Sequence, residues 1–319
     1  MVGVNGGRAL PLAAAGLVGV LVAAGQLARA GTVKSQDRDP AFSVDGKELA
    51  FVRWTGATGR VMLMRADGTG LHAVTKPQPQ PYGLTWSPEE RSLAYSSGGD
   101  IWRADLDTGA LVNLTATPDA QESEAAWSPD GSRLAFMSLE GCVRCSKVYV
   151  VAPDGTARTM ISDQGRRPAW SPDGSRIALA GSPMRIVDLD AGSSVTYVNG
   201  SYPAWSPNGH LVAYDGQPGL RVLDTAGKSD RLVTKKLSAV PTWSPDGRRI
   251  AAATTTNESL GIVYANGRGL RVVGGADLTN DAPSWSKDTG LLAFVERGRC
   301  GIDVVRADGT HRRRLTHAC

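Results

Sequence analysis

The chain repeats one short motif seven times, and this repetition restricts the fold more than any other feature of the sequence. The motif is complete at Trp127–Gly131, which reads Trp-Ser-Pro-Asp-Gly, and it recurs unchanged at 170–174 and 243–247. Altered copies begin at positions 42, 86, 205 and 285, so successive copies lie 35 to 44 residues apart. A period near 40 residues is typical of the blades of a β-propeller. The sequence therefore predicts an all-β, seven-bladed propeller of four-stranded antiparallel blades.

The third repeat indicates how one blade is built. Residues 124–127 have the pattern of a short first strand, and Ser128–Gly131 has the chemistry of a tight turn, because Pro presets φ and Gly accepts a positive φ. Alternating apolar residues predict a second strand at 133–138 and a third at 147–152. After a second Asp-Gly turn, residues 158–161 are expected to form the fourth strand.

A small residue lies in the middle of each predicted second strand, between two larger apolar residues. These residues are Ala50, Ala94, Ala135, Ala178, Ala213, Ala251 and Ala293. Because side chains alternate along a strand, we expect the alanines to face a closely approaching neighbouring blade and the larger residues to face the opposite packing layer. Six of the eight Trp residues are motif residues, and we expect them to fill the space between adjacent blades.

The order of the predicted strands also says how the ring closes. A first strand begins at about Pro40 and a final fourth strand ends at about Leu315. We therefore expect closure between whole blades, with blades one and seven in contact only through side chains.

The repeat resembles the WD40-like propeller repeats of TolB-type proteins, in which Pro-Ala-Trp-Ser-Pro-Asp-Gly is followed by Ile-Ala-Phe, an Asp-Gly turn and Leu-Thr. Pro168–Gly174, Pro203–Trp205, Ala66–Gly68 and Leu315–Thr316 carry the resemblance, which covers about residues 38–317. TolB itself has an α/β domain before its propeller, and this sequence has no counterpart of it. The resemblance implies a cell-envelope protein that docks a partner protein at the mouth of the propeller channel.

Residues 1–30 differ in composition from the repeats. A positive start that ends at Arg8 precedes an apolar run at 9–25, and Ala28-Arg29-Ala30 supplies small residues at the spacing of a cleavage site. This layout is typical of a cleavable secretory signal. The alternative is an uncleaved membrane anchor, whose core would be close to the lower length limit for a span. We expect an exported chain, periplasmic, in the cell envelope or secreted, in which residues 31–319 form a single propeller domain without a membrane span.

The charge balance gives little indication of an anionic partner. The full chain has 35 basic and 31 acidic residues, and two of the basic residues lie in the signal. This balance is unlike that of a nucleic-acid-binding protein. The one basic run, Arg312–Arg314, falls on the predicted last strand, where alternate side chains are expected to face solvent. We expect a monomer with an envelope or extracellular protein as its partner, and no nucleic acid.

All four cysteines follow the signal, and an even number in an exported chain predicts disulfides. The expected strand order favours the pairs Cys142–Cys145 and Cys300–Cys319 among the three pairings that four cysteines allow. Cys-x-x-Cys is also a thiol-redox motif, although such motifs normally begin a helix, and this one lies in a predicted hairpin loop. A zinc site is not expected because no histidine is near.

Few residues have the pattern of a catalytic site. The four histidines, His72, His210, His311 and His317, are not expected to converge, and no Gly-x-Ser-x-Gly is present. The Asp residues of the repeated motif have the position of turn residues. We therefore expect no metal and no cofactor.

The residues just before each copy of the motif vary most between repeats, and they are expected to line the mouth of the central channel. Where a scaffold repeats and its loops do not, the loops are the candidate site. The candidates are Tyr82, Glu122, Glu124, Arg166, Arg167, Tyr202, Lys235 and Asp281. The alternative, that these residues only solvate one rim, stays open.

Two functions are compatible with these residues. The first is a non-enzymatic, TolB-like binding module that docks a partner protein or ligand at the channel mouth. The second is a lyase or hydrolase with a carboxylate and an Arg in the channel, drawn from Glu122, Glu124, Arg166, Arg167 and Asp281. An enclosed pocket with a converging carboxylate and Arg favours the enzyme, whereas a broad open rim favours a protein partner.

Overall fold

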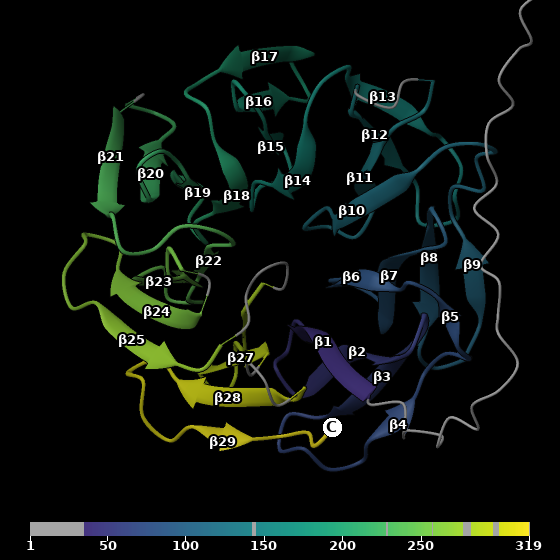
Figure 1. Ribbon diagram of the computed structural model, residues 1–319. Coiled ribbons are helices and arrows are strands. Elements are labelled where there is room, and N and C mark those ends of the chain that lie inside the picture. The colour runs from purple at the N-terminus through teal and green to yellow at the C-terminus, as the bar shows by residue number, and fades with distance from the viewer. Residues whose placement is uncertain are drawn as a thin grey trace, which may run out of the picture. The chain divides into compact units, whose positions relative to one another are not determined.

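The fold is a seven-bladed β-propeller, as the repeat predicts. The computed structural model describes residues 35–141, 145–227, 229–256, 258–276, 282–295 and 300–318. Within these ranges the chain forms seven antiparallel sheets in sequence order. Figure 1 shows the sheets around a common centre, with the first strand of each sheet innermost and the later strands progressively further out.

Each blade runs outward in chain order, with consecutive strands paired. Blades one to three consist of β1 (Ser35–Phe42), β2 (Glu48–Thr55), β3 (Thr58–Arg65), β4 (His72–Ala73) and β5 (Gln78–Pro79); β6 (Tyr82–Trp86), β7 (Ser92–Ser97), β8 (Asp100–Asp105) and β9 (Leu111–Asn113); and β10 (Glu122–Trp127), β11 (Leu134–Ser138), β12 (Lys147–Val151) and β13 (Thr159–Ser162).

Blades four to seven follow the same plan. They consist of β14 (Arg166–Trp170), β15 (Arg176–Ala180), β16 (Arg185–Asp188) and β17 (Ser193–Thr196); β18 (Ser201–Trp205), β19 (Leu211–Asp215), β20 (Leu220–Asp224) and β21 (Ser229–Thr234); β22 (Thr242–Trp243), β23 (Arg249–Ala253), β24 (Ser259–Tyr264) and β25 (Arg271–Gly274); and β26 (Ser284–Trp285), β27 (Leu291–Val295), β28 (Ile302–Arg306) and β29 (Arg313–Arg314).

The strands of the third repeat lie within two residues of their predicted bounds. Blade one departs from the common plan, because β5 adds a short fifth strand beside β3. Its first strand also begins at Ser35, five residues before the predicted start. The first three strands of this blade are eight residues long, so they extend further than those of the other blades.

The Ser-Pro-Asp-Gly segments form the tight turns between first and second strands, and we call them the inner turns. In blade three the Gly131 amide donates to the Ser128 carbonyl at 3.0 Å, and Gly131 has φ +66°. The Ser128 hydroxyl donates to Asp130 Oδ1 at 2.6 Å and accepts from the Arg133 amide at 2.9 Å. The Asp side chains thus serve the turn itself, as expected. Hydrogen bonds from the Ser128 hydroxyl, and then from the Ser132 hydroxyl and amide, lower the pKa of Asp130 to about 2.

Packing between blades follows the predicted alternation on the second strands. Ala50 is fully buried against Leu93 and Tyr95 of blade two, whereas its neighbours Leu49 and Phe51 pack in a different cluster. That cluster contains Ala293 of blade seven, so the same arrangement closes the ring. The small residue lets neighbouring sheets approach, and the larger residues fill the layer on the other side.

The motif tryptophans connect the blades by hydrogen bonds as well as by packing. The indole Nε1 of Trp170 donates to the Ala126 carbonyl of the preceding blade at 2.9 Å. Trp86, Trp205, Trp243 and Trp285 make the equivalent bond at 2.9 to 3.4 Å. The prediction that these residues fill the space between blades is therefore confirmed. A buried indole N–H needs an acceptor, and the preceding strand supplies it for these five tryptophans, whereas Trp127 Nε1 has no partner among the described residues.

The ring closes between whole blades, as predicted, but the contact between blades one and seven includes more than side chains. The Asp37 amide donates to the Cys300 carbonyl at 2.9 Å, which corrects the expectation of side-chain contacts alone. The first motif has Phe42 in place of Trp, and its backbone N–H donates to Ser284 Oγ at 2.9 Å. Arg313 reaches across to the carbonyls of Ala66 and Asp67 at 3.2 and 3.1 Å. Part of the basic run, of which alternate side chains were expected to face solvent, therefore binds the neighbouring blade.

Several predictions fall outside the described residues and stay predictions. They are the signal at 1–30 and the disulfides, since each expected pair includes Cys142 or Cys319. Neither described cysteine, Cys145 nor Cys300, is a free thiol. Among the residues that the structure describes, no helix is long and apolar enough to span a membrane.

Candidate functional site

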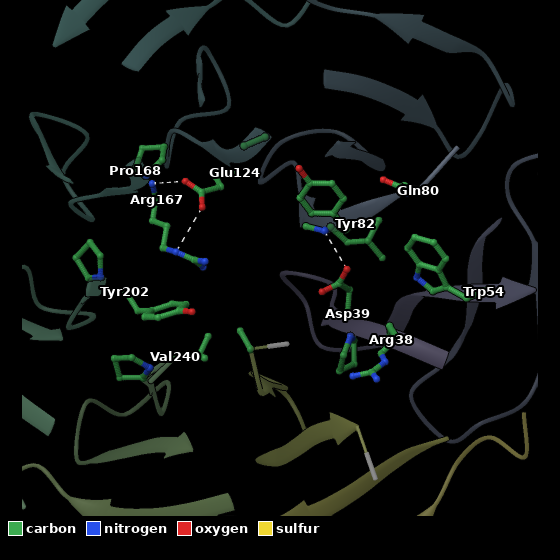
Figure 2. Close-up of a pocket in the computed structure, with 17 residues that line it drawn as sticks. Arg38, Asp39, Trp54, Gln80, Tyr82, Glu124, Arg167, Pro168, Tyr202 and Val240 are labelled. Atoms are coloured by element: carbon green, nitrogen blue, oxygen red, sulfur yellow. Dashed lines mark hydrogen bonds and ion pairs between the residues drawn. The ribbon is translucent and has the colours of Figure 1, made fainter. Parts of the chain in front are cut away.

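The candidate site is a cavity of about 860 Å³ at the end of the central channel where the first strands begin. All seven blades contribute to its wall, and Figure 2 shows the side chains around the opening. The lining residues are Arg38, Asp39, Pro40, Trp54, Gln80, Tyr82, Gly83, Leu84, Glu124, Ala125, Arg167, Pro168, Tyr202, Pro203, Val240, Pro241 and Ala282.

One position in every blade, three residues before the motif, is central to this wall. We call these residues the channel ring: Asp39, Gly83, Glu124, Arg167, Tyr202, Val240 and Ala282. The first six have a positive φ, between +51° and +67°. In blades one to five the pairing of the first and second strands shifts register at this position, so the ring residue lies in a β-bulge.

The bulge explains why such different residues share one place in the wall. An extra residue in a strand bends the backbone and turns a side chain out of the regular alternation. A positive φ is unfavourable for most non-glycine residues, and a β-branched residue such as Val240 is rarely found there. The surrounding blades therefore impose this conformation on the ring, and five side chains of the channel ring with φ above zero lie in the cavity wall.

Both carboxylates of the channel ring accept a backbone amide from the next blade. Asp39 Oδ2 accepts from the Gly83 amide at 3.0 Å, and Glu124 Oε2 accepts from the Arg167 amide at 2.7 Å. In each case the donor is the ring residue of the following blade. These carboxylates therefore stabilise neighbouring bulges, because an amide freed from the ladder needs an acceptor.

Arg167 is held on two sides. Its Nε lies 3.4 Å from Glu124 Oε1, and its guanidinium carbon lies 3.8 Å from the centroid of the Tyr202 ring. About a third of the Arg167 side chain is exposed. Figure 2 shows the guanidinium pointing from the wall into the cavity, between Glu124 and Tyr202. A stacked guanidinium has a fixed plane, which makes the directions of its hydrogen-bond donors definite.

The rest of the wall is largely apolar and poor in backbone donors. Tyr82 is 42 % exposed, and Trp54 comes from the extended end of β2 in blade one. Proline follows the ring residue in blade one and in blades four to seven, and Pro40, Pro168, Pro203 and Pro241 belong to the lining. Because proline has no N–H, these strands offer few amide donors to a ligand.

The structure brings four of the eight candidate residues together. Tyr82, Glu124, Arg167 and Tyr202 line the cavity. Arg166 and Lys235 are exposed and do not belong to its lining, and Asp281 lies outside the described residues.

Glu122 lies in a different environment from Glu124, although only Ser123 separates them. Glu122 is buried, and its Oε1 is 2.8 Å from Nη1 of Arg158 on the outer side of the blade. Asp37, five residues before the first motif, is equally buried and binds Arg53 at 2.7 and 2.9 Å. The position five residues before the motif therefore faces into the blade in both cases. Glu122 forms an ion pair in the core and does not line the channel.

Sequence reasoning missed Arg38, Asp39, Trp54 and Val240, which also line the cavity. Counting three residues back from each motif identifies Asp39 and Val240. Trp54 lies outside the repeat pattern, and only the length of β2 brings it to the channel mouth.

The described residues contain no group of three or more His, Cys, Asp or Glu side chains that could hold a metal ion. His72 and His311 are both exposed, and they lie near the outer strands of different blades. The cavity therefore presents two arginine side chains, Arg38 and the partly exposed Arg167, two carboxylates that accept backbone amides, and aromatic and proline surfaces.

Comparison with known proteins assigns the family. Residues 34–221 match the TolB beta propeller domain, so the chain belongs to this family, and the predicted resemblance is confirmed. No curated protein matches the sequence.

Solved structures with the same fold have diverse functions. TolB from Acinetobacter baumannii has 19 % identity and a TM-score of 0.53, covering 82 % of this chain and 77 % of that one. An oligogalacturonate lyase in complex with manganese has 17 % identity and a TM-score of 0.67, covering 82 % and 86 %. A puromycin-hydrolyzing peptidase from Mycobacterium tuberculosis has 14 % identity and a TM-score of 0.68, covering 90 % of this chain and 54 % of that one. At these identities the likeness concerns the fold alone.

Proposed function

We propose that this TolB-family propeller is an exported, non-enzymatic binding module that docks a segment of a partner protein at the channel mouth. The observation that carries the proposal is the channel ring, in which one backbone bulge recurs around the cavity with a different side chain in almost every blade. A repeated scaffold with varied side chains at one rim is the arrangement expected of a recognition surface.

The chemistry of the wall supports binding over catalysis. Both ring carboxylates accept backbone amides, and Glu124 is also paired with Arg167, so neither is poised to exchange a proton with a ligand. The exposed aromatic faces of Tyr82 and Tyr202 offer large contact areas of the kind that is enriched in protein interfaces.

Export is part of the proposal and rests on residues 1–30, which have the layout of a secretory signal. N-terminal sequencing of the protein from its native cells tests it. We expect the mature chain to begin at about Gly31, and an intact Met1 on an intracellular protein would contradict export.

Charge reversal at the mouth tests the docking site. The purified protein is incubated with native envelope extract, and bound proteins are compared between wild type and the double variant Arg166→Glu with Arg167→Glu. We expect the variant to lose the wild-type partner. Replacing the exposed Arg166 should cost little, and loss of the Arg167–Glu124 ion pair should cost up to about 1 kcal/mol, so an unfolding curve is recorded to show that the variant stays folded.

The chain offers a closely matched control at the opposite end of a blade. Arg248 and Arg249 are also adjacent, and Arg249 stacks on Tyr264 at 4.8 Å as Arg167 stacks on Tyr202. Reversing both to Glu should leave capture intact. Equal loss in the two double variants would show a general charge effect and would remove the mouth as the site.

A second candidate function is a lyase or hydrolase, and the 3.4 Å approach of Glu124 to Arg167 in the cavity favours it. Two proteins of similar fold are named as a lyase and a peptidase. Incubation of the protein with oligogalacturonate and manganese, and separately with aminoacyl substrates, tests this candidate. Turnover that is lost in Glu124→Gln would favour the enzyme over the binding module.

A further inference from the structure

The Arg167 guanidinium has two donor atoms that no residue of the described chain satisfies. Nε of Arg167 faces Glu124, but within the described ranges Nη1 and Nη2 meet no hydrogen-bond partner. The Tyr202 ring under the guanidinium holds its plane, and Figure 2 shows its free edge directed into the cavity. A planar, fixed pair of N–H donors matches the two oxygens of a carboxylate.

The acidic residues nearby do not replace such a ligand. Glu124 Oε2 accepts from the Arg167 amide, and Asp39 Oδ2 accepts from the Gly83 amide. The other oxygen, Glu124 Oε1, lies nearest to Nε, at 3.4 Å, and no hydrogen bond joins Glu124 to Nη1 or Nη2. The strongest unfilled interaction in the wall is therefore one that calls for an anionic acceptor.

The surface beside Arg167 is apolar. Tyr202, Pro203, Val240, Pro241 and Ala282 form a continuous series of lining residues from blades five to seven. None of these side chains except the Tyr202 hydroxyl can hydrogen-bond, and the two prolines lack an amide N–H. A sugar would leave many hydroxyls without partners here, whereas an aliphatic or aromatic peptide side chain would be well accommodated.

We infer that the cavity recognises a peptide that carries a carboxylate next to an apolar side chain, with Arg167 binding the carboxylate and blades five to seven binding the apolar group. This rests on the proposed docking function and names the chemistry of the docked segment. The carboxylate can belong to the C-terminus of the partner or to an Asp or Glu side chain, because the two present the same pair of oxygens.

A peptide array distinguishes these sources. Hexapeptides with one aliphatic or aromatic residue are synthesised in three forms. The first has a free C-terminal carboxylate and no acidic side chain, and the second is amidated at its C-terminus and contains one Glu. The third is amidated at its C-terminus and contains no acid, and it is the neutral form. Dissociation constants of the unlabelled binders are then measured by titration calorimetry with wild type, Arg167→Gln and the matched control Arg249→Gln. Arg167→Lys, which keeps the charge but loses the planar fork, provides a second variant.

We expect acidic forms to bind more tightly than their neutral amides. Arg167→Gln should weaken the acidic forms about tenfold, the usual worth of a hydrogen bond to a charged group, and leave the neutral form unchanged. Arg167→Lys should give a smaller loss, and Arg249→Gln none. Preference for the free C-terminus or for Glu identifies the source, and either preference supports the inference.

Two results would overturn it in different ways. If neutral amides bind as tightly as acids and lose affinity in Tyr202→Ala but not in Arg167→Gln, the mouth docks peptides without recognising a carboxylate. If no form binds wild type, peptide docking itself fails, and the inference fails with it. A thermal unfolding curve for each variant shows whether a loss of binding reflects a loss of fold.

Discussion

The two ends of the first strands differ in what is repeated from blade to blade. At one end, the inner turns repeat both backbone and side chains, and at the other, the channel ring repeats the backbone bulge with changing side chains. In blade four, Ser171 Oγ donates to Asp173 Oδ1 at 2.5 Å, and the Ser175 amide donates to the same oxygen at 3.0 Å. Side chains that serve their own backbone are restricted to a few types, such as Asp173 and the equivalent Asn208, whereas side chains directed at a cavity are free to differ.

This contrast separates residues that build the propeller from residues that give it specificity. A change in an inner turn should lower stability and leave recognition unaffected in the molecules that fold. A change in the channel ring should do the reverse. Three substitutions test this, from the largest expected effect on stability to the smallest.

Gly46→Ala should be strongly destabilising, because Gly46 lies where blade one meets blade seven. A Cβ there would approach Ser286 Oγ to 2.6 Å and the Asp288 amide nitrogen to 2.7 Å, and φ is +75°. Overpacking and the positive φ together should cost about 2–4 kcal/mol of unfolding free energy. Chemical denaturation measures this cost.

Gly290→Ala is the matched control for that measurement. Gly290 ends the inner turn of blade seven with φ +63°, but a Cβ there meets nothing within 4 Å. Only the backbone strain remains, at about 1–2 kcal/mol. If the two variants are equally destabilised, close packing between the turns of blades one and seven contributes nothing.

Asp173→Asn should make a small, pH-dependent difference. The Ser171 hydroxyl, and then the Ser175 amide, lower the pKa of Asp173 to about 2. A carboxylate whose pKa falls on folding stabilises the fold above its unfolded value of about 3.9, and loses this contribution as the pH drops towards 2. Asp173 is exposed, so the contribution at pH 7 should be under about 1 kcal/mol.

Blade five shows that the inner turn forms with an amide at this position. Asn208 accepts from Ser206 Oγ at 2.7 Å and from the His210 amide at 3.2 Å. We therefore expect the Asp173→Asn variant to fold, with a stability that approaches wild type as the pH falls from 4 to 2. Denaturation midpoints at several pH values measure the difference, and a constant gap over that range would show that titration of Asp173 is not its source.

Glu124→Gln should have the smallest effect on stability. The amide oxygen of Gln can still accept from the Arg167 backbone N–H, and only the partly exposed ion pair with the Arg167 side chain is lost. Such pairs are worth about 0–1 kcal/mol. A loss well above this range would place the channel ring among the structural elements and would contradict the separation drawn from the two ends.

Local sequence alone was enough to predict most of the scaffold. The motif at Trp127 gave the blade number and the inner turns, because turn chemistry depends only on adjacent residues. Alternation around Ala50 gave the packing between blades, because the side-chain period of a strand is fixed at two. The variable residues before each motif also predicted that Tyr82, Glu124, Arg167 and Tyr202 lie near the channel mouth.

Only the tertiary structure decided which of these side chains reach the cavity. The β-bulge breaks the period of two between Glu122 and Glu124, so one is buried beside Arg158 and the other faces the channel. No adjacent residue indicates a bulge with a positive φ at residues as different as Asp39, Arg167 and Val240. The packed neighbouring blades impose that conformation, and the stack of Arg167 on Tyr202 likewise exists only because blades four and five are neighbours in the ring.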